Sequence, residues 1–519
     1  MKKILGILIS ILMLLGILSG FKLTAHASNL DDFDYYPASE KTVLITGYKG
    51  NSKEVKIPSK IEGFTVVGIS EQTFYGHENI TKVTLPNTII CIRAGVFKDT
   101  ALYKNPKNWK DGSLYVSNAL IEVKPSKVKG SYKVKAGTTC IADNAFANCI
   151  NLKEVTIPKS VKGIDYRAFY GCKNLAKIHI SHNVKYIGTE IFKDTAYYKN
   201  SKNWKNNALY LKDCLVEANK KKVKGNYKIK RGTTYLAESA FKNCKKLTSV
   251  TVPNSVTKIE VGGFENCSKL KNVTLSKKMT TIESGTFFKC KNLKNIKIPE
   301  KVTSIGDMAF MCCNSLEEIK LPKNITELNA MTFAYCTNLK SITIPEKITN
   351  INTVVFAECK NLTKVSIPKK VTSIAEDAFD GCSKLTDIDY KGTKSQWKKV
   401  DIWSNVESSD VIYKAAIHCK DGIVEPSILR PTKIKSLNSS KKSMKLTWKK
   451  TDYIKGYQIQ ISTDSKFKKN VKSVKITKAT TTKTTISNLK SGKKYYVRIR
   501  TYKGKERSDW SKVKVVTVK

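Results

Sequence analysis

The fold is decided by one stretch of sequence, Ala145-Phe146-Ala147-Asn148-Cys149-Ile150-Asn151-Leu152-Lys153-Glu154-Val155-Thr156-Ile157-Pro158-Lys159-Ser160-Val161-Lys162-Gly163-Ile164-Asp165-Tyr166-Arg167-Ala168-Phe169. Its opening pair, alanine and phenylalanine, returns at the end after 23 residues. Phenylalanine keeps this spacing along most of the 519-residue chain, apart from two gaps of 49 residues. It stands at Phe74, Phe97, Phe146, Phe169, Phe192, Phe241, Phe264, Phe287, Phe310, Phe333, Phe356 and Phe379. This recurrence predicts a solenoid in which each repeat forms one coil.

Each coil is expected to contain one short strand. In the quoted copy, Leu152, Val155 and Ile157 alternate with polar residues, which predicts a strand with Val155 and Ile157 pointing inward. Glu154 and Thr156 then point outward. A single coil cannot bury its own apolar side, so the coils must stack and share one continuous core.

The outward strand position forms a candidate binding surface along the coils. A row of hydroxyl and ammonium groups offers regular contacts to an extended protein or glycan. Threonine is also a common residue on any exposed strand, and the sequence leaves both interpretations open. His179 replaces the usual threonine, which favours a surface substitution over a metal ligand. The column consists of Thr84, Thr156, His179, Thr251, Thr274, Lys297, Lys320, Thr343 and Ser366.

Cysteine forms a second column. Of the 14 cysteines, nine follow the repeat phenylalanine by three residues. Free cysteine packs as a small hydrophobe, and an odd column of side chains that point the same way disfavours pairing into disulfides. We therefore predict a ladder of buried thiols, made of Cys149, Cys172, Cys244, Cys267, Cys290, Cys313, Cys336, Cys359 and Cys382.

The two gaps of 49 residues hold related inserts, near residues 98–136 and 193–231. Residues 114–116 and 131–134 read as strands, as do their counterparts in the second insert, and predict hairpin-like elaborations of a coil. Trp109 and Trp204 are candidate sugar-stacking platforms, although packing inside the insert is the favoured role. The repeated landmarks are Phe97, Tyr103, Trp109 and Gly137, followed 95 residues later by Phe192, Tyr198, Trp204 and Gly232.

The N-terminal segment predicts export. Lys2 and Lys3 precede an apolar run that ends at Phe21, and Ala25-His26-Ala27 offers a cleavage site. We expect a signal peptide over residues 1–27 and no transmembrane segment after its removal. The C-terminal residues contain no covalent sorting signal, so we expect a secreted protein that associates with the bacterial cell surface and wall.

The positive charge is unevenly distributed. The chain has 93 Lys and Arg against 43 Asp and Glu, a net charge of +50, and loss of residues 1–27 leaves +47. Residues 427–519 alone carry 27 basic and four acidic residues, a net +23. We expect this segment to bind a polyanion, with an anionic cell-wall polymer as the leading partner. Export argues against nucleic acid.

The repeat resembles the BspA-like leucine-rich repeats of bacterial surface proteins, from about Tyr48 to Cys419. The resemblance implies an α/β-to-β solenoid, with an N-terminal cap at residues 28–47, repeats at 48–386, and a C-terminal cap and linker at 387–426. It also implies host-matrix or intercellular adhesion.

The last segment, residues 427–519, reads as a separate module of short alternating strands. Trp448, a tyrosine-corner pattern from Leu489 to Tyr495, and Ser508-Asp509-Trp510-Ser511 resemble a fibronectin type III domain, an all-β immunoglobulin-like sandwich.

The sequence contains no recognisable catalytic constellation. No Ser or Cys lies in a nucleophile motif, no paired acidic positions suggest a glycosidase, and no close Cys-x-x-Cys pair with His predicts zinc. We expect no enzymatic activity, no cofactor and no metal. The leading hypothesis is an exported binding protein, an adhesin that contacts an extracellular protein or glycan through the solenoid. A glycan-binding accessory protein of a polysaccharide-degrading system is the alternative, and a secreted hydrolase with an unrecognised site is third.

Overall fold

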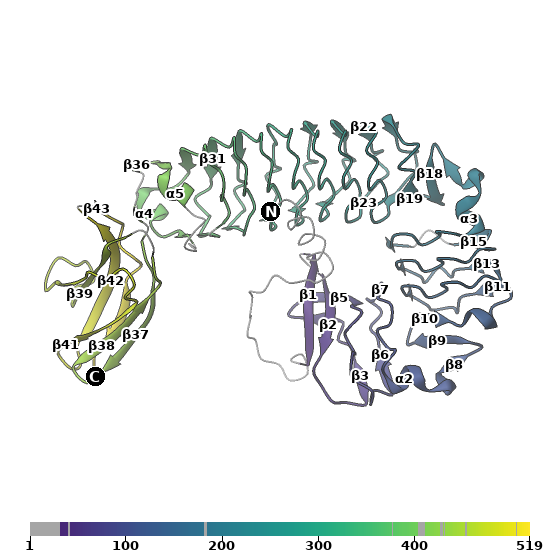
Figure 1. The fold of residues 1–519 in the computed structure, drawn as a ribbon, viewed down its shortest axis with the longest axis horizontal. Coiled ribbons are helices and arrows are strands. Elements are labelled where there is room, and N and C mark those ends of the chain that lie inside the picture. The colour runs from purple at the N-terminus through teal and green to yellow at the C-terminus, as the bar shows by residue number, and fades with distance from the viewer. Residues whose placement is uncertain are drawn as a thin grey trace.

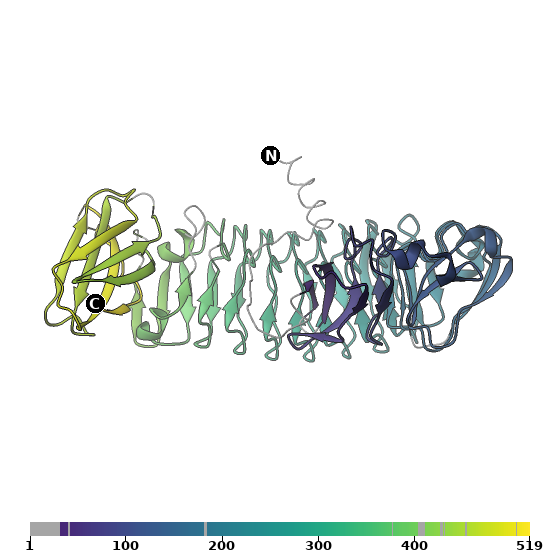
Figure 2. The ribbon, with the colours of Figure 1, turned by 90° about the horizontal axis from the view of Figure 1, so that it is seen from below.

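The computed structural model describes residues 32–39, 42–180, 184–375, 377–402, 410–425, 429, 431–451, 454–504 and 506–519. The predicted signal peptide lies outside the described residues. The coils stack into a curved array that ends in a separate sandwich (Figure 1). From below, they stand side by side as successive rungs (Figure 2). No helix within the described ranges is both long and apolar enough to cross a membrane.

The longer strand of each coil lies on the convex side of the array (Figure 1). Neighbouring strands pair in parallel, and Val155 pairs with Ile178, 23 residues further along. In β13, Val155 is fully buried and Thr156 is exposed, as the alternation predicts. This convex ladder comprises β3 (Glu54–Lys56), β6 (Lys82–Thr84), β11 (Gly130–Lys133), β13 (Leu152–Thr156), β15 (Lys177–His179), β20 (Gly225–Lys228), β22 (Leu247–Thr251), β24 (Asn272–Thr274), β26 (Asn295–Ile296), β29 (Ser341–Thr343), β31 (Lys364–Ile367), β33 (Asp387–Tyr390) and β35 (Ala416–Cys419).

A second set of short strands lies on the concave side (Figure 1). Most contain two residues, and the second is a buried Ile or Leu such as Ile164 or Ile305. This concave ladder comprises β5 (Phe64–Ile69), β7 (Cys91–Ile92), β12 (Cys140–Ile141), β14 (Gly163–Ile164), β16 (Tyr186–Ile187), β21 (Tyr235–Leu236), β23 (Lys258–Ile259), β25 (Thr281–Ile282), β27 (Ser304–Ile305), β28 (Glu327–Leu328), β30 (Asn350–Ile351), β32 (Ser373–Ile374) and β34 (Asp401–Ile402).

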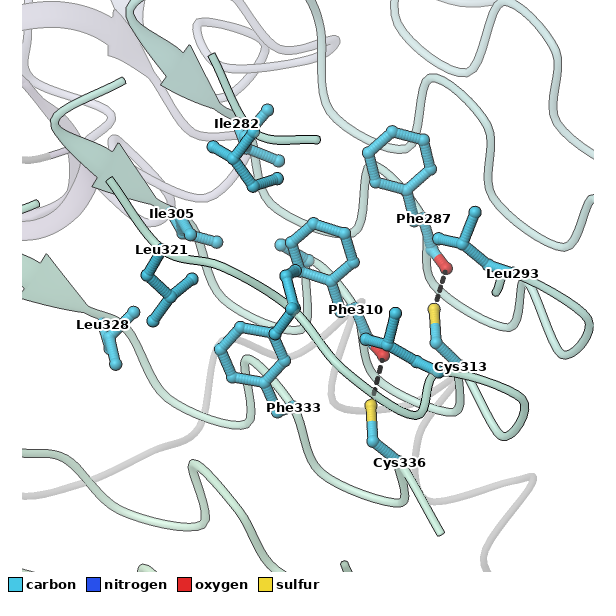
Figure 3. Close-up of a cluster of buried hydrophobic side chains, with 14 of the residues drawn as sticks. Ile282, Phe287, Leu293, Ile305, Phe310, Cys313, Leu321, Leu328, Phe333 and Cys336 are labelled. Carbon is cyan, nitrogen blue, oxygen red and sulfur yellow. Dashed lines mark hydrogen bonds between the residues drawn. The ribbon is translucent and has the colours of Figure 1, made fainter. Parts of the chain in front are cut away.

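The core between the ladders is built around the repeat phenylalanines (Figure 3). Rings of adjacent coils stack with centroids 5.0–5.8 Å apart, for example 5.3 Å between Phe287 and Phe310. Burial of each such ring contributes about 1.5–3 kcal/mol. The predicted thiol ladder is present: all nine column cysteines are free and fully buried.

Each insert is a short helix followed by a three-stranded antiparallel meander. In the first, β10 pairs with β9 and also runs parallel to β12, which joins the meander to the concave ladder. The first insert comprises α2 (Ala101–Lys104), η1 (Pro106–Asn108), β8 (Trp109–Lys110), β9 (Ser113–Val116), β10 (Ala119–Val123) and η2 (Pro125–Lys127). The second comprises α3 (Ala196–Lys199), η3 (Ser201–Asn203), β17 (Trp204–Lys205), β18 (Ala208–Leu211) and β19 (Cys214–Ala218).

The predicted strand over residues 131–134 has a different role from the one expected. It forms β11, which pairs in parallel with β13 and belongs to the convex ladder. The hairpin partner of β9 is therefore β10, not the later strand. Tyr132 pairs with Val155, one full period later, so this segment completes an ordinary coil.

Antiparallel strands close both ends of the solenoid. At the N-terminal end, β1 (Phe33–Ser39) pairs with β2 (Thr42–Tyr48), which lies against β5, and β4 (Lys60–Ile61) also pairs with β5. At the other end, β36 (Gly422–Val424) pairs with β35, beside α4 (Lys394–Trp397) and α5 (Asp410–Lys414). These caps cover sheet edges that would otherwise offer open hydrogen-bonding groups.

The C-terminal module has its own core around Trp448 and Tyr457. The hydroxyl of Tyr495 accepts a hydrogen bond from the backbone N–H of Lys490 at 3.2 Å, in the segment expected to form a tyrosine corner. One sheet contains β37 (Ile434–Ser440), β38 (Ser443–Trp448) and β41 (Lys483–Ser487). The other contains β40 (Lys472–Ile476), β39 (Gly456–Ser462), β42 (Lys494–Lys503), β43 (Glu506–Arg507) and β44 (Lys514–Thr517).

Candidate binding surfaces

The outward strand column lies on the convex ladder. Thr156 pairs with His179, Thr251 with Thr274, and Thr343 with Ser366 in the parallel register. The column residues are exposed apart from Ser366, which is half-buried. Thr84, Lys297 and Lys320 hold the same position in their coils. Lys297 follows directly after β26, and Lys320 lies in a described coil that has no convex strand. The column therefore presents one polar row to solvent, and its role in binding stays a prediction.

His179 takes part in this surface through a side-chain hydrogen bond. Its Nε2 lies 2.6 Å from Oε1 of Glu154 on the neighbouring strand, and both side chains contact solvent. Across the described ranges, no group of three or more His, Cys, Asp or Glu is placed to hold a metal ion. His179 thus lies at an exposed position of the outward column.

The two insert tryptophans share one packing arrangement. The indole N–H of Trp109 donates to the carbonyl of Tyr103 at 2.9 Å, and that of Trp204 donates to Tyr198 at 2.7 Å. Each indole meets its tyrosine edge to face, with centroids 5.2 and 5.1 Å apart. Both indoles are half-buried. Packing thus fixes each ring while part of it stays open to solvent.

A pocket of about 360 Å³ opens beside Trp109. Its walls include Tyr103 and Pro106, and Lys124 places its Nζ 4.5 Å from the centroid of the indole. Glu122 also lines the pocket, where its carboxylate accepts a hydrogen bond from the Tyr103 hydroxyl at 2.9 Å. Burial, together with Glu122, raises the pKa of Tyr103 to about 12, so this tyrosine remains a donor at neutral pH.

One end of the sandwich carries a cluster of exposed lysines, which we call the lysine tip. Three backbone bonds bring its loops together: Lys442 N–H donates to Lys519 at 2.9 Å, Leu489 to Lys442 at 3.0 Å, and Val518 to Lys493 at 3.0 Å. The loop between β39 and β40 lies at the same end, because Ser462 pairs with Tyr496 at the start of β42. The tip contains Lys441, Lys442, Lys466, Lys468, Lys469, Lys490, Lys493, Lys494 and Lys519.

The lysine tip lies at the end of the sandwich away from the solenoid (Figure 1). The junction is marked by an ion pair of 2.6 Å between Lys433 and Asp401, and β37 leads from there to the tip. Asp464 lies among the tip lysines, where its carboxylate accepts backbone N–H groups from Lys466 and Lys468 at 2.9 and 2.8 Å. These bonds hold the pKa of Asp464 below its ordinary value.

A stack of arginine and aromatic side chains covers the outer face of the sheet formed by β39 and β42. The guanidinium carbons of Arg498 and Arg500 lie 4.4 and 4.2 Å from the centroid of the Trp510 ring. Arg498 also lies 4.0 Å from the centroid of Phe467. Burial, followed by repulsion from Arg500, lowers the pKa of Arg498 below its ordinary value.

Sequence reasoning missed a buried charge cluster on the concave side. Arg93 lies 3.1 Å from Asp165, whose other carboxylate oxygen accepts the backbone N–H of Ile92 at 2.9 Å. The Tyr186 hydroxyl lies 3.3 Å from Asp165 and donates to Glu238 at 2.9 Å. Burial raises the pKa of Asp165, although Arg93 acts in the opposite direction. The cluster ties together coils that are separated by the inserts, which gives it a structural role.

Two family models match the chain. The BspA type leucine rich repeat region matches residues 48–107, 130–224, 218–339 and 303–400. The fibronectin type III domain matches residues 429–517. No curated protein matches the chain.

Several solved structures are similar to it. A leucine rich cell surface protein from Faecalibacterium prausnitzii is 25% identical, covering 74% of this chain and 100% of that one, with a TM-score of 0.24. A leucine-rich repeat protein from Bacteroides ovatus is 23% identical, covering 66% and 94%, with a TM-score of 0.29. The pneumococcal vaccine antigen PcpA is 18% identical, covering 72% and 96%, with a TM-score of 0.29. Membership is decided by the family models: the chain belongs to the BspA-type leucine-rich repeat family and ends in a fibronectin type III domain.

Proposed function

We propose that this chain is an exported, non-enzymatic binding protein of the bacterial cell surface. It acts as an adhesin whose solenoid contacts an extracellular protein or glycan, while the basic sandwich retains it on an anionic wall polymer. The repeat family supports the first role, because stacked coils present an extended surface to a partner. The second role is supported by the lysine tip.

The observation that carries this proposal is the position of the charge. The sandwich holds +23 in 93 residues, and nine of its lysines lie at the end away from the solenoid. A polyanion bound there leaves both faces of the coil array accessible. Exposed lysines contact phosphate as mobile point charges, so binding should depend strongly on salt.

The test compares three forms of the full chain on immobilised polyglycerol phosphate. One form is unaltered, and a second carries Lys441→Gln, Lys442→Gln, Lys490→Gln, Lys493→Gln and Lys494→Gln. The third carries five exposed substitutions on the solenoid, Lys153→Gln, Lys173→Gln, Lys269→Gln, Lys301→Gln and Lys370→Gln. The measurement is the salt concentration that releases each form.

We expect the tip variant to elute at clearly lower salt than the solenoid variant, although both lose the same charge. Equal elution of the two variants would show that total charge alone governs binding. If the tip variant and the unaltered chain are released at the same salt concentration, retention through the sandwich is excluded.

A glycan-binding accessory protein remains the second candidate. The observation that favours it is the pocket beside Trp109, where an aromatic wall and polar groups meet.

A further inference from the structure

We propose that the pocket beside Trp109 binds a sugar unit that carries a carboxylate, such as a uronic acid. The inference rests on the proposed function, because it identifies one class of extracellular glycan that the solenoid binds. The pocket volume of about 360 Å³ falls within the range of small-molecule sites. It has room for a single pyranose ring and its substituents.

The wall that would meet the sugar ring is already rigid. The N–H of Trp109 is held by the Tyr103 carbonyl at 2.9 Å, and the Tyr103 ring packs edge to face against the indole. Pro106 adds a second flat apolar surface, fixed at the start of the η1 turn. Rigid aromatic walls favour binding, because little side-chain freedom is lost when the ligand arrives.

The charge of the pocket selects for an acid. Lys98, Lys104 and Lys124 all line it, against the single carboxylate of Glu122. Glu122 is engaged by the Tyr103 hydroxyl, so its charge is partly satisfied within the protein. Lys104 also pairs with Glu78 at 3.2 Å, outside the pocket lining. The Nζ of Lys124 lies 4.5 Å from the centroid of the indole, where it can pair with the carboxylate of a sugar ring bound beside it.

The second insert separates the packing role from the binding role. Tyr198, Trp204 and Glu217 repeat the tyrosine, tryptophan and glutamate, with the Tyr198 hydroxyl donating to Glu217 at 2.9 Å. The two positions that would contact the ligand differ, because Ser201 replaces Pro106 and Asn219 replaces Lys124. The shared tyrosine, tryptophan and glutamate thus pack each insert. Pro106 and Lys124 occur in the first insert alone, so acidic-sugar binding is proposed for that insert.

The experiment titrates the full chain with tetragalacturonic acid and follows binding by calorimetry. All forms carry the five lysine-tip substitutions, so that the basic sandwich contributes little background. Fully methyl-esterified tetragalacturonate serves as the neutral probe. Binding variants are Trp109→Phe and Lys124→Asn, and Trp204→Phe is the matched control in the second insert.

We expect the acid to bind at least tenfold more tightly than its ester. Lys124→Asn and Trp109→Phe should each weaken binding of the acid about tenfold, while Trp204→Phe leaves it unchanged. Ser201→Pro with Asn219→Lys should add a second binding equivalent, a gain that misfolding cannot mimic. Equal affinity for acid and ester, or no response to Lys124→Asn and Trp109→Phe, would overturn the inference. Retention on polyglycerol phosphate, measured on chains with an intact tip, tests the proposed function separately.

Discussion

The thiol of Cys313 donates a hydrogen bond to the backbone carbonyl oxygen of Phe287, at 3.3 Å (Figure 3). The same carbonyl accepts the backbone N–H of Cys290 at 3.0 Å, so both of its lone pairs are engaged. Seven column cysteines bond in this way to the repeat phenylalanine of the preceding coil, at 2.9–3.3 Å. The thiol fills apolar space and satisfies a buried carbonyl at once, which explains why cysteine occupies this column.

Replacement of Cys313 by alanine should destabilise its coil. We expect a loss of about 1–2 kcal/mol, because the variant leaves a small cavity and removes one donor from a buried carbonyl. Hydrogen exchange of the amides in neighbouring coils is the appropriate measurement, since repeat arrays open locally. The control is Cys312→Ala, a half-buried neighbour outside the column, which should cost less than about 0.5 kcal/mol. Equal effects of the two substitutions would contradict the role of the thiol bond.

The thiol column should also make the solenoid sensitive to alkali. Burial raises the pKa of most column thiols, that of Cys244 to about 12. The unfolded chain loses these protons near pH 9, whereas the native chain keeps them to higher pH, so stability is full below pH 9 and falls as pH rises further. The measurement is urea unfolding between pH 8 and 11.

A matched variant isolates the contribution of the thiols from other groups that titrate at alkaline pH. The variant combines Cys290→Val, Cys313→Val and Cys336→Val. It removes three buried thiol groups and keeps apolar side chains of similar size. We expect the stability of this variant to decline less steeply above pH 9 than that of the unaltered chain. Parallel declines would rule out the thiols as the cause.

The repeat period predicted most of the architecture, because a 23-residue spacing fixes both the register and the inward residues. Val155 and its column could be assigned directly from alternation. The sequence predicts a strand at residues 131–134 but places it in the insert, because local alternation identifies a strand and not its neighbour. Tyr132 stands one period before Val155, and the period applied there predicts the pairing that the structure shows.

Contacts across the inserts could not be predicted in this way. Arg93 and Asp165 are 72 residues apart, one gap of 49 and one of 23, so they hold the same position two coils apart, whereas the period predicts contacts between adjacent coils. Their contact depends on how the first insert leaves the array and how the array curves. The pocket beside Trp109 depends likewise on two separate segments, the η1 turn that carries Pro106 and the end of β10 that Lys124 follows.

Asp143 gives a prediction at acidic pH. Burial, followed by repulsion from Asp165, raises its pKa to about 6, and one of its carboxylate oxygens has no hydrogen-bond partner among the residues that the structure describes. The pKa of Asp143 is higher in the folded chain than in the unfolded chain. The protonated carboxyl therefore contributes its full share of stability below about pH 4, and this share is lost as pH rises through 6. Asp143→Asn should therefore be more stable than the unaltered chain at pH 7.5 and equal to it near pH 4. Asparagine keeps an oxygen acceptor for the backbone N–H of Ala94, now 3.3 Å away.

Denaturant unfolding at the two pH values provides the measurement for Asp143. Glu318→Gln removes an exposed carboxylate from the convex side and is the control, with no expected change between pH 4 and 7.5. A stabilisation by Asp143→Asn that is the same at both pH values would show that ionisation is not its cause.

Trp510 should stabilise the sandwich without affecting the solenoid. Its ring lies against two guanidinium groups, those of Arg498 and Arg500, which would repel each other without the ring. Each cation–π contact contributes about 0.5–1 kcal/mol at a partly exposed site, so Trp510→Ala should cost the sandwich about 1–2 kcal/mol. Trp510→Phe keeps a ring and should cost less. Because the sandwich has a separate core, hydrogen exchange should quicken there and stay unchanged in the coils. Faster exchange in the coils of Trp510→Ala would mean that the two modules unfold as one unit.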